Sequence, residues 1–91
     1  MRFEWDESKN ESNRIKHGID FRDAAKVFDE FTYTESDERF DYGEQRFLTF
    51  GLLFGEVVAI SHTENDELIR IISVRKAERN EQEAYYKNIR D

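Results

Sequence analysis

The chain has 91 residues, no cysteine, no proline and a formal net charge of −7 at pH 7. This length allows a single domain (residues 1–91) with one modest core, and the lack of cysteine excludes disulfides and thiolate metal sites. The acidic balance argues against indiscriminate binding of nucleic acid, which requires many phosphates to be neutralised.

The positive charge is concentrated at the two ends of the chain. Residues 18–45 carry nine acidic and three basic side chains, whereas residues 68–91 carry six basic and four acidic ones. If the ends meet in the fold, a local basic patch forms on an acidic protein. No stretch resembles a signal peptide or a membrane span, so we expect a cytoplasmic protein without membrane contact.

The first elements are a short strand and a capped helix. Charged and aromatic side chains alternate over residues 2–5, which predicts a strand with one buried face. Asp6 is expected to cap a helix over Glu7–His17 that ends at Gly18. Ile15 is its main apolar residue, so this helix should be largely solvated.

A second helix should follow at once. Asp20 is suited to cap a helix over residues 21–29, because apolar side chains recur there with helical spacing. This apolar stripe consists of Phe21, Ala24, Ala25 and Phe28.

The rest of the chain predicts a β-meander followed by a helix. Residues 32–34 suit a short strand, and the acidic residues 35–44 should form a surface loop. Three strands with short turns between them follow, and such short turns require antiparallel neighbours. They are expected at residues 46–54, 57–63 and 68–74, with a final helix over residues 76–89. The fold class is therefore α+β, an antiparallel sheet with two N-terminal helices and one C-terminal helix.

Four cations lie where the last strand is expected to lead into the last helix. They are Arg70, Arg75, Lys76 and Arg79. Arginine matches phosphate oxygens with a planar fork, and a helix N-terminus favours anions. Arg70 and Arg75 would lie on opposite faces of a regular strand, but they could converge because Arg75 lies at the strand end. The competing interpretation is that these cations form surface ion pairs with the acidic loop.

The two histidines are the remaining candidates for acid–base chemistry. His62 lies on an expected central strand, which favours a packed, hydrogen-bonded role, whereas His17 ends a helix, where either the helix dipole or chemistry accounts for it. Tyr85 suits packing in the last helix. No motif for a metal or a cofactor is present, so we expect neither.

Several segments together resemble the BrnT toxin family. The opening match is Phe3-Glu4-Trp5-Asp6, Lys9, Asn13, Lys16-His17-Gly18 and Asp20-Phe21. The middle match is Ala24-Ala25, Val27-Phe28-Asp29 and Tyr42-Gly43-Glu44-Gln45-Arg46. The closing match is His62-Thr63-Glu64, the run from Ile69 to Ala77, Glu81 and Tyr85.

The resemblance implies the toxin of a type II toxin–antitoxin pair, with a RelE-like ribonuclease fold. Such toxins cut RNA and lower translation under stress, and a DNA-binding BrnA antitoxin masks them, so this chain would meet DNA only through its antitoxin. The matching site positions are Lys16, His17, Arg70, Ser73, Arg75, Lys76 and Tyr85.

Metal-free RNA cleavage needs a base, an acid and a stabiliser of the phosphorane. Arg70 and Arg75 suit the stabilising role, while Lys76 and Arg79 would position the RNA backbone. The candidates for the base are His17, Lys16, Glu64 and His62. The alternative function is a non-catalytic module whose acidic middle segment binds a basic partner protein.

Overall fold

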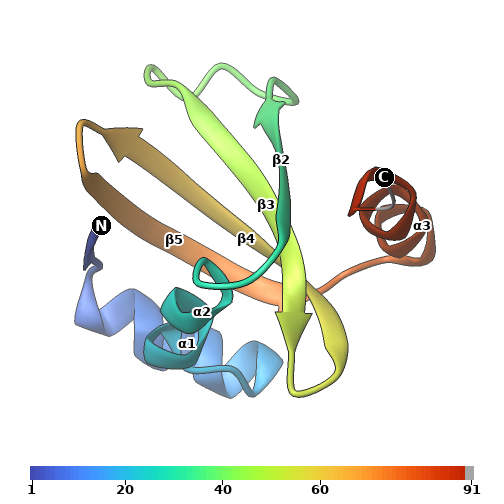
Figure 1. Ribbon diagram of the computed structural model, residues 1–91. Coiled ribbons are helices and arrows are strands. Elements are labelled where there is room, and N and C mark those ends of the chain that lie inside the picture. Colours follow the sequence, from blue (N-terminus) through green and yellow to red (C-terminus); the bar gives the residue numbers. More distant parts are fainter. Residues whose placement is uncertain (90–91) are drawn as a thin grey trace.

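A five-stranded sheet organises the chain, as shown by a computed structural model that describes residues 1–89 (Figure 1). The strands lie in the order β1-β5-β4-β3-β2. Strand β1 pairs with β5 in parallel, and all other pairs are antiparallel. The strands are β1 (Arg2–Glu4), β2 (Thr32–Asp37), β3 (Arg46–Leu53), β4 (Glu56–Asn65) and β5 (Leu68–Lys76). The predicted meander and the α+β class are confirmed.

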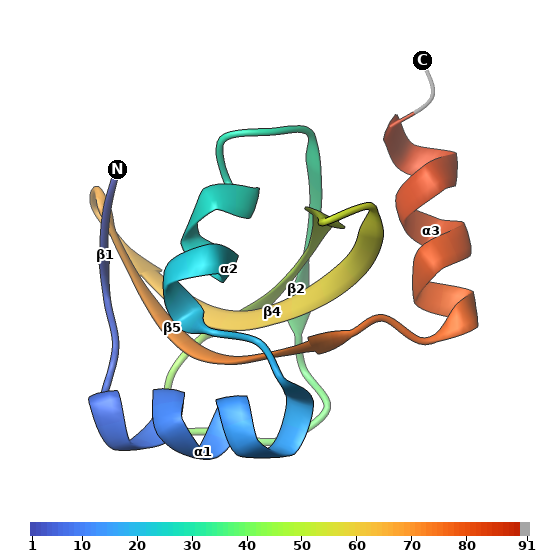
Figure 2. The same ribbon diagram turned by 90° about the horizontal axis from the view of Figure 1, so that it is seen from below.

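Three helices complete the fold: α1 (Glu7–His17), α2 (Phe21–Val27) and α3 (Arg79–Ile89). The predicted caps of α1 are confirmed, since Asp6 accepts the Ser8 N–H at 2.8 Å and Gly18 has a φ of 72°. Figure 2 shows α2 in the hollow of the curved sheet and α3 standing at its far end. Within residues 1–89, no helix combines the length and apolarity needed to cross a membrane.

The core has two parts, one on each face of the sheet, because β4 is buried on both sides. Val58 and Ile60 pack toward α2, whereas Val57 and Ala59 pack with Tyr85 of α3. Successive strand residues point to opposite faces, so these pairs assign each face of the sheet to one core. We call the side that packs against Tyr85 the α3 face.

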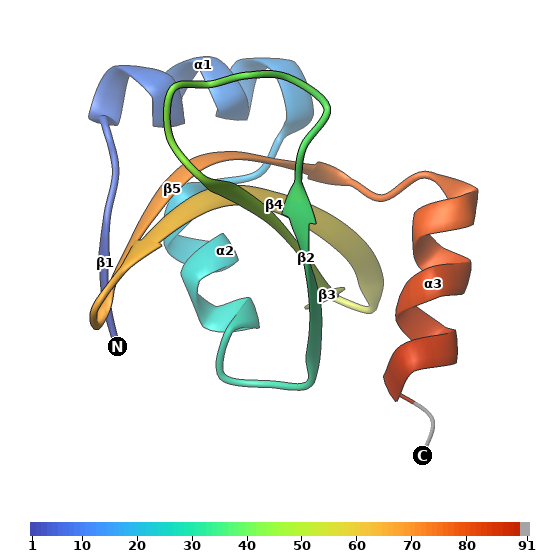
Figure 3. The same ribbon diagram turned by 90° about the horizontal axis from the view of Figure 1, so that it is seen from above.

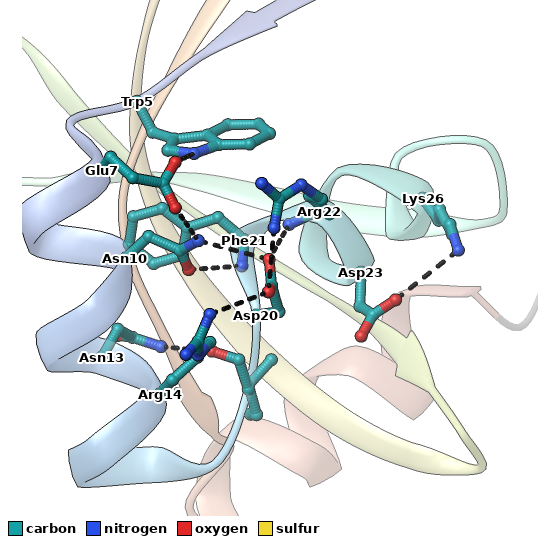
Figure 4. A network of polar contacts seen from close by, with 11 residues as sticks. Trp5, Glu7, Asn10, Asn13, Arg14, Asp20, Phe21, Arg22, Asp23 and Lys26 are labelled. Atoms are coloured by element: carbon teal, nitrogen blue, oxygen red, sulfur yellow. Dashed lines mark hydrogen bonds and ion pairs between the residues drawn. The ribbon is translucent and has the colours of Figure 1, made fainter.

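Helix α1 is attached to the rest of the fold by two asparagines and not by apolar residues. Ile15 is 83% exposed, whereas Asn10 and Asn13 are buried. Asn10 accepts the Phe21 N–H at 2.9 Å and donates to Asp20 at 3.3 Å (Figure 4). These bonds satisfy backbone and side-chain groups at the start of α2, where α1 and α2 meet at a corner.

The second asparagine covers an open strand edge. Strand β1 pairs only with residues 68–70 of β5, which leaves the rest of that edge without a neighbouring strand. Asn13 accepts the buried N–H of Val74 at 3.1 Å and donates to the Ile19 carbonyl at 3.1 Å. A buried N–H without a partner is costly, so this bond explains why α1 lies along β5.

Several predicted boundaries were wrong by one to three residues, and three of them matter for the site. Helix α2 ends at Val27 and not at residue 29, because the N–H groups of residues 28–30 turn back to carbonyls three positions earlier. Strand β2 continues to Asp37 through the expected loop, since its backbone pairs with β3 over residues 46–48. Lys76 ends β5, and the last helix begins only at Arg79. Backbone pairing prevails over the weak strand propensity of acidic residues.

Candidate functional site

A bulge in β5 determines which side chains share the α3 face. Ser61 pairs with Ser73 and His62 with Ile71, so Ile72 has no partner on β4. One extra residue turns all later side chains over to the other face. Arg70 and Arg75 therefore lie on the same face although they are five residues apart. The two arginines share that face because Arg75 belongs to the strand and not to the turn after it.

Arg75 is held by a carboxylate from α3. Its two terminal nitrogens donate to the two oxygens of Glu81 at 2.7 and 3.0 Å, and Glu81 also accepts the Glu78 N–H at 2.8 Å. The hydrogen bond with Glu81 raises the pKa of Arg75, and the same bond lowers the pKa of Glu81. Both groups are charged, and the guanidinium is fixed at the start of α3.

Arg70 shares a carboxylate with a third arginine. Its Nη2 donates to both oxygens of Glu44 at 2.8 Å, and Arg46 contacts the same carboxylate at 3.2 Å. The Arg70 and Glu44 side chains are 45% and 36% exposed. An ion pair this exposed contributes at most about 1 kcal/mol, so a phosphate could replace Glu44. Of the four cations at the end of β5, Arg70 forms the expected ion pair with the acidic loop, whereas Arg75, Lys76 and Arg79 pair with acidic residues elsewhere.

A fourth arginine follows the end of β2. Arg39 donates to both oxygens of buried Asp37 at 2.8 and 2.9 Å. Asp37 lies opposite Arg46, which alternates with Leu48 and Phe50 and therefore belongs to the α3 face. We call Arg39, Arg46, Arg70 and Arg75 the arginine face. Sequence reasoning assigned no role to Arg39, Arg46 or Glu81. The alternation of acidic and basic residues over 37–46 is the signal that could have found Arg39 and Arg46, but it does not reach Glu81.

Lys16 and His17 reach the same part of β5 from its edge. They line a shallow depression of about 290 Å³ together with Ile72 and Ser73, at the bulge. Ser73 lies opposite Ser61, so it belongs to the α3 face between Arg70 and Arg75. The structure therefore places Lys16, His17 and Ser73 around one depression, and it places Arg70 and Arg75 on the same face of the sheet as Ser73.

Two of the expected cations lie apart from this group. Lys76 pairs with Val58 in the sheet, on the face opposite to Arg75, and its Nζ lies 3.3 Å from Glu56. The Arg79 side chain is 94% exposed and lies 3.5 Å from Glu83. Both are surface residues with acidic neighbours.

Two further candidates lie in the core. His62 has no exposed surface, its Nε2 shares a 2.6 Å hydrogen bond with Thr49, and its ring stacks on Phe47. The expected packed role of His62 is what the structure shows. Tyr85 is 2% exposed and donates to the Phe31 carbonyl at 3.2 Å. Neither ring is accessible to a large substrate. Within residues 1–89, no three His, Asp or Glu side chains gather as metal ligands would.

Comparisons with known proteins point to one family. Residues 5–81 match a family described as the ribonuclease toxin BrnT of type II toxin–antitoxin systems. Among solved structures, the chain is similar to the ribonuclease toxin BrnT of Brucella abortus, whose crystal structure was determined at 1.1 Å. The two are 27% identical with a TM-score of 0.64, over 87% of this chain and 99% of that chain. No curated protein gave a significant match.

Proposed function

Because this chain belongs to the BrnT family of ribonuclease toxins of type II toxin–antitoxin systems, we propose that its arginine face cleaves RNA without a metal ion. Membership of the family implies a ribonuclease activity and a cognate antitoxin. The observation that carries the proposal is the bulge at Ile72, which turns Arg70 and Arg75 toward the same side of the sheet.

The proposed reaction uses the 2′-hydroxyl of the RNA as the nucleophile. Its proton passes to a base as it forms a bond to the adjacent phosphorus. The bond to the 5′-oxygen breaks and that oxygen takes up a proton from water, which leaves a 2′,3′-cyclic phosphate and a 5′-hydroxyl end. Negative charge develops on the non-bridging oxygens during this step. Arg70 and Arg75 stabilise that charge, since both remain protonated and can donate in pairs.

His17 is the proposed base and Lys16 its neighbour on the same helix end. Both line the depression that reaches Ser73, which lies between Arg70 and Arg75 along β5, and the proposal places the reacting phosphate over Ser73. His17 is assigned the base because imidazole is the side chain that most often acts as a general base in enzymes. Ser73 donates a hydrogen bond to the substrate in this arrangement.

Lys76 and Arg79 have a weaker part in the proposal. They lie outside the arginine face, so they attract the RNA backbone as exposed charges and do not contact the reacting phosphate. Tyr85 does not contact the substrate in this proposal, because its ring is buried.

The test is cleavage of a labelled oligoribonucleotide in the presence of a chelator, with the product ends identified by mass spectrometry. We expect cyclic-phosphate ends, no cleavage of a substrate with 2′-deoxy sugars, and a loss of about 10²- to 10³-fold for Arg75→Ala. Arg22→Ala is the matched control, since Arg22 is an exposed arginine paired with Asp20 away from this face. Equal rates for Arg75→Ala and the wild type would remove Arg75 from the site.

The proposed inhibitor is a BrnA-like, DNA-binding antitoxin, through which the chain contacts DNA only indirectly. Coexpression with the neighbouring gene tests this part. We expect a small protein to copurify with the chain and to abolish RNA cleavage when it is added back to the purified toxin. Cleavage that persists with the bound partner would contradict an inhibitory role.

A further inference from the structure

The loop between β2 and β3 contains a depression that the proposed cleavage step leaves unassigned. It has a volume of about 390 Å³ and is lined by residues 36–42 and 44–46. Figure 3 shows this loop as the green segment that joins the end of β2 to β3. Glu44 bridges Arg46 and Arg70, so the depression borders the arginine face.

Two aromatic rings and an arginine form the distinctive part of this depression. The ring centroids of Phe40 and Tyr42 are 5.7 Å apart, at an interplanar angle of 74°. The guanidinium carbon of Arg46 lies 4.0 Å from the centroid of the Tyr42 ring. Phe40 itself is 68% exposed, so its ring is open to a ligand.

A buried carboxylate holds this loop in place. Asp37 is the acceptor for both Arg39 and the Tyr42 hydroxyl, which lies 3.1 Å away, and its side chain is only 1% exposed. The hydrogen bonds from Arg39 are the main cause that lowers the pKa of Asp37 to about 2, against the effect of burial. A single exposed phenylalanine needs no explanation, but one on a loop anchored by a buried, hydrogen-bonded carboxylate is preorganised for contact.

We propose that this depression binds a nucleobase of single-stranded RNA, which stacks on Phe40 beside the phosphate held by the arginine face. The inference rests on the ribonuclease function proposed above. Every base has a flat face that can stack on an aromatic ring, and Arg39 and Arg46 line the same depression, so they would supply cations to the neighbouring phosphates. The combination of exposed aromatic, fixed arginines and an adjoining anion site is what single-stranded RNA requires.

The test measures binding separately from cleavage. A labelled, uncleavable 2′-O-methyl oligoribonucleotide is titrated with the full chain, and fluorescence anisotropy gives the Kd. A parallel set of oligonucleotides carries one abasic position, moved along the strand. The variants are Phe40→Ala, Phe40→Trp and Phe31→Ala, the last being a control because Phe31 is 78% exposed outside the loop.

We expect Phe40→Ala to weaken binding about ten-fold or more, and Phe40→Trp and Phe31→Ala to bind like the wild type. One abasic position should weaken binding to the wild type but not to Phe40→Ala. Unchanged binding by Phe40→Ala, with its fold verified by circular dichroism, overturns the subsite while leaving the cleavage proposal intact if Arg75→Ala is inactive. The subsite is also overturned if Phe40→Ala binds RNA like the wild type but is no longer bound by the antitoxin, because the loop would then contact protein. A wild type that neither binds nor cuts RNA overturns both proposals.

Discussion

Arg75 and Glu81 form a two-pronged ion pair that joins β5 to the first turn of α3, with contacts of 2.7 and 3.0 Å. Truncating Glu81 leaves a partly buried guanidinium without its partner and removes the acceptor of the Glu78 N–H. We expect Glu81→Ala to lower the free energy of unfolding by about 1.5–3 kcal/mol, measured by urea denaturation. RNA cleavage should fall as well, because Arg75 is then no longer held in position.

Glu83→Ala is the matched control for that variant. Glu83 lies on the same helix, but its side chain is 70% exposed and its pair with Arg79 is long, at 3.5 Å. The free energy of unfolding of Glu83→Ala should stay within about 0.5 kcal/mol of that of the wild type. If both variants were equally stable and equally active, the Arg75–Glu81 pair would have no positioning role.

The bond between Asn13 and the Val74 N–H predicts a second sensitive position. In Asn13→Ala the N–H of Val74 stays buried but has lost its acceptor, which costs about 1–3 kcal/mol. Urea denaturation of this variant should show that loss, and amide hydrogen exchange at Val74 should accelerate. Ser12→Ala, at an exposed neighbouring position of α1, should leave both measurements unchanged.

His62 should make the fold sensitive to acid. Burial lowers its pKa from the ordinary value of 6.5, and the nearby charge of Glu64 only partly opposes this effect. Above pH 6.5 the His62 imidazole is neutral in both the folded and the unfolded chain, so His62 adds no pH dependence to the free energy of unfolding. Below it the unfolded chain binds a proton that the folded chain does not, so the free energy of unfolding decreases by up to about 1.4 kcal/mol per pH unit.

This acid sensitivity is measured as the urea midpoint between pH 7 and pH 5. His62→Gln should remove most of the decrease over this range, whereas His17→Gln should retain it. A wild-type midpoint that stays constant over this range would show that His62 is protonated as easily in the fold as outside it.

Gly51 marks the close approach of α2 to β3. A Cβ atom at this position would collide with Cγ1 of Val27 and would lie 3.2 Å from Cγ2 of Thr32. Gly51→Ala should therefore cost about 1–3 kcal/mol of stability through overpacking. In a double-mutant cycle, Val27→Ala should relieve part of that cost, so the two changes should be less than additive. Strict additivity would place the strain elsewhere.

The sequence predicted most of the elements because their signals are local. Asp6, Gly18 and Asp20 act through neighbouring backbone groups, and the turns of the meander are short enough to leave one geometry. The parallel pairing of β1 with β5 was not predicted, since it joins residues more than 60 positions apart. The docking of α1 was also missed, because an apolar pattern cannot reveal two buried asparagines.

The candidate site was only partly predictable for a similar reason. Arg70 and Arg75 were predicted as site residues, but they share a face only because of a bulge that no sequence signal in β5 predicts. Arg39 lay in a segment predicted to be a loop and Arg46 at the start of a predicted strand, and only their pairing with Asp37 and Glu44 shows their place.

The unpaired Ile72 also bears on how this strand can change in length. Removing that one residue would take the bulge out of β5, and every later side chain would keep its partner on β4 and its face of the sheet. Val74 would stay opposite Ile60 in the core beneath α2, and Arg75 would stay opposite Ala59 on the arginine face. A single-codon deletion at the bulge would therefore preserve core and site together, whereas a residue inserted in the regular part of the strand would turn the side chains beyond it to the wrong face.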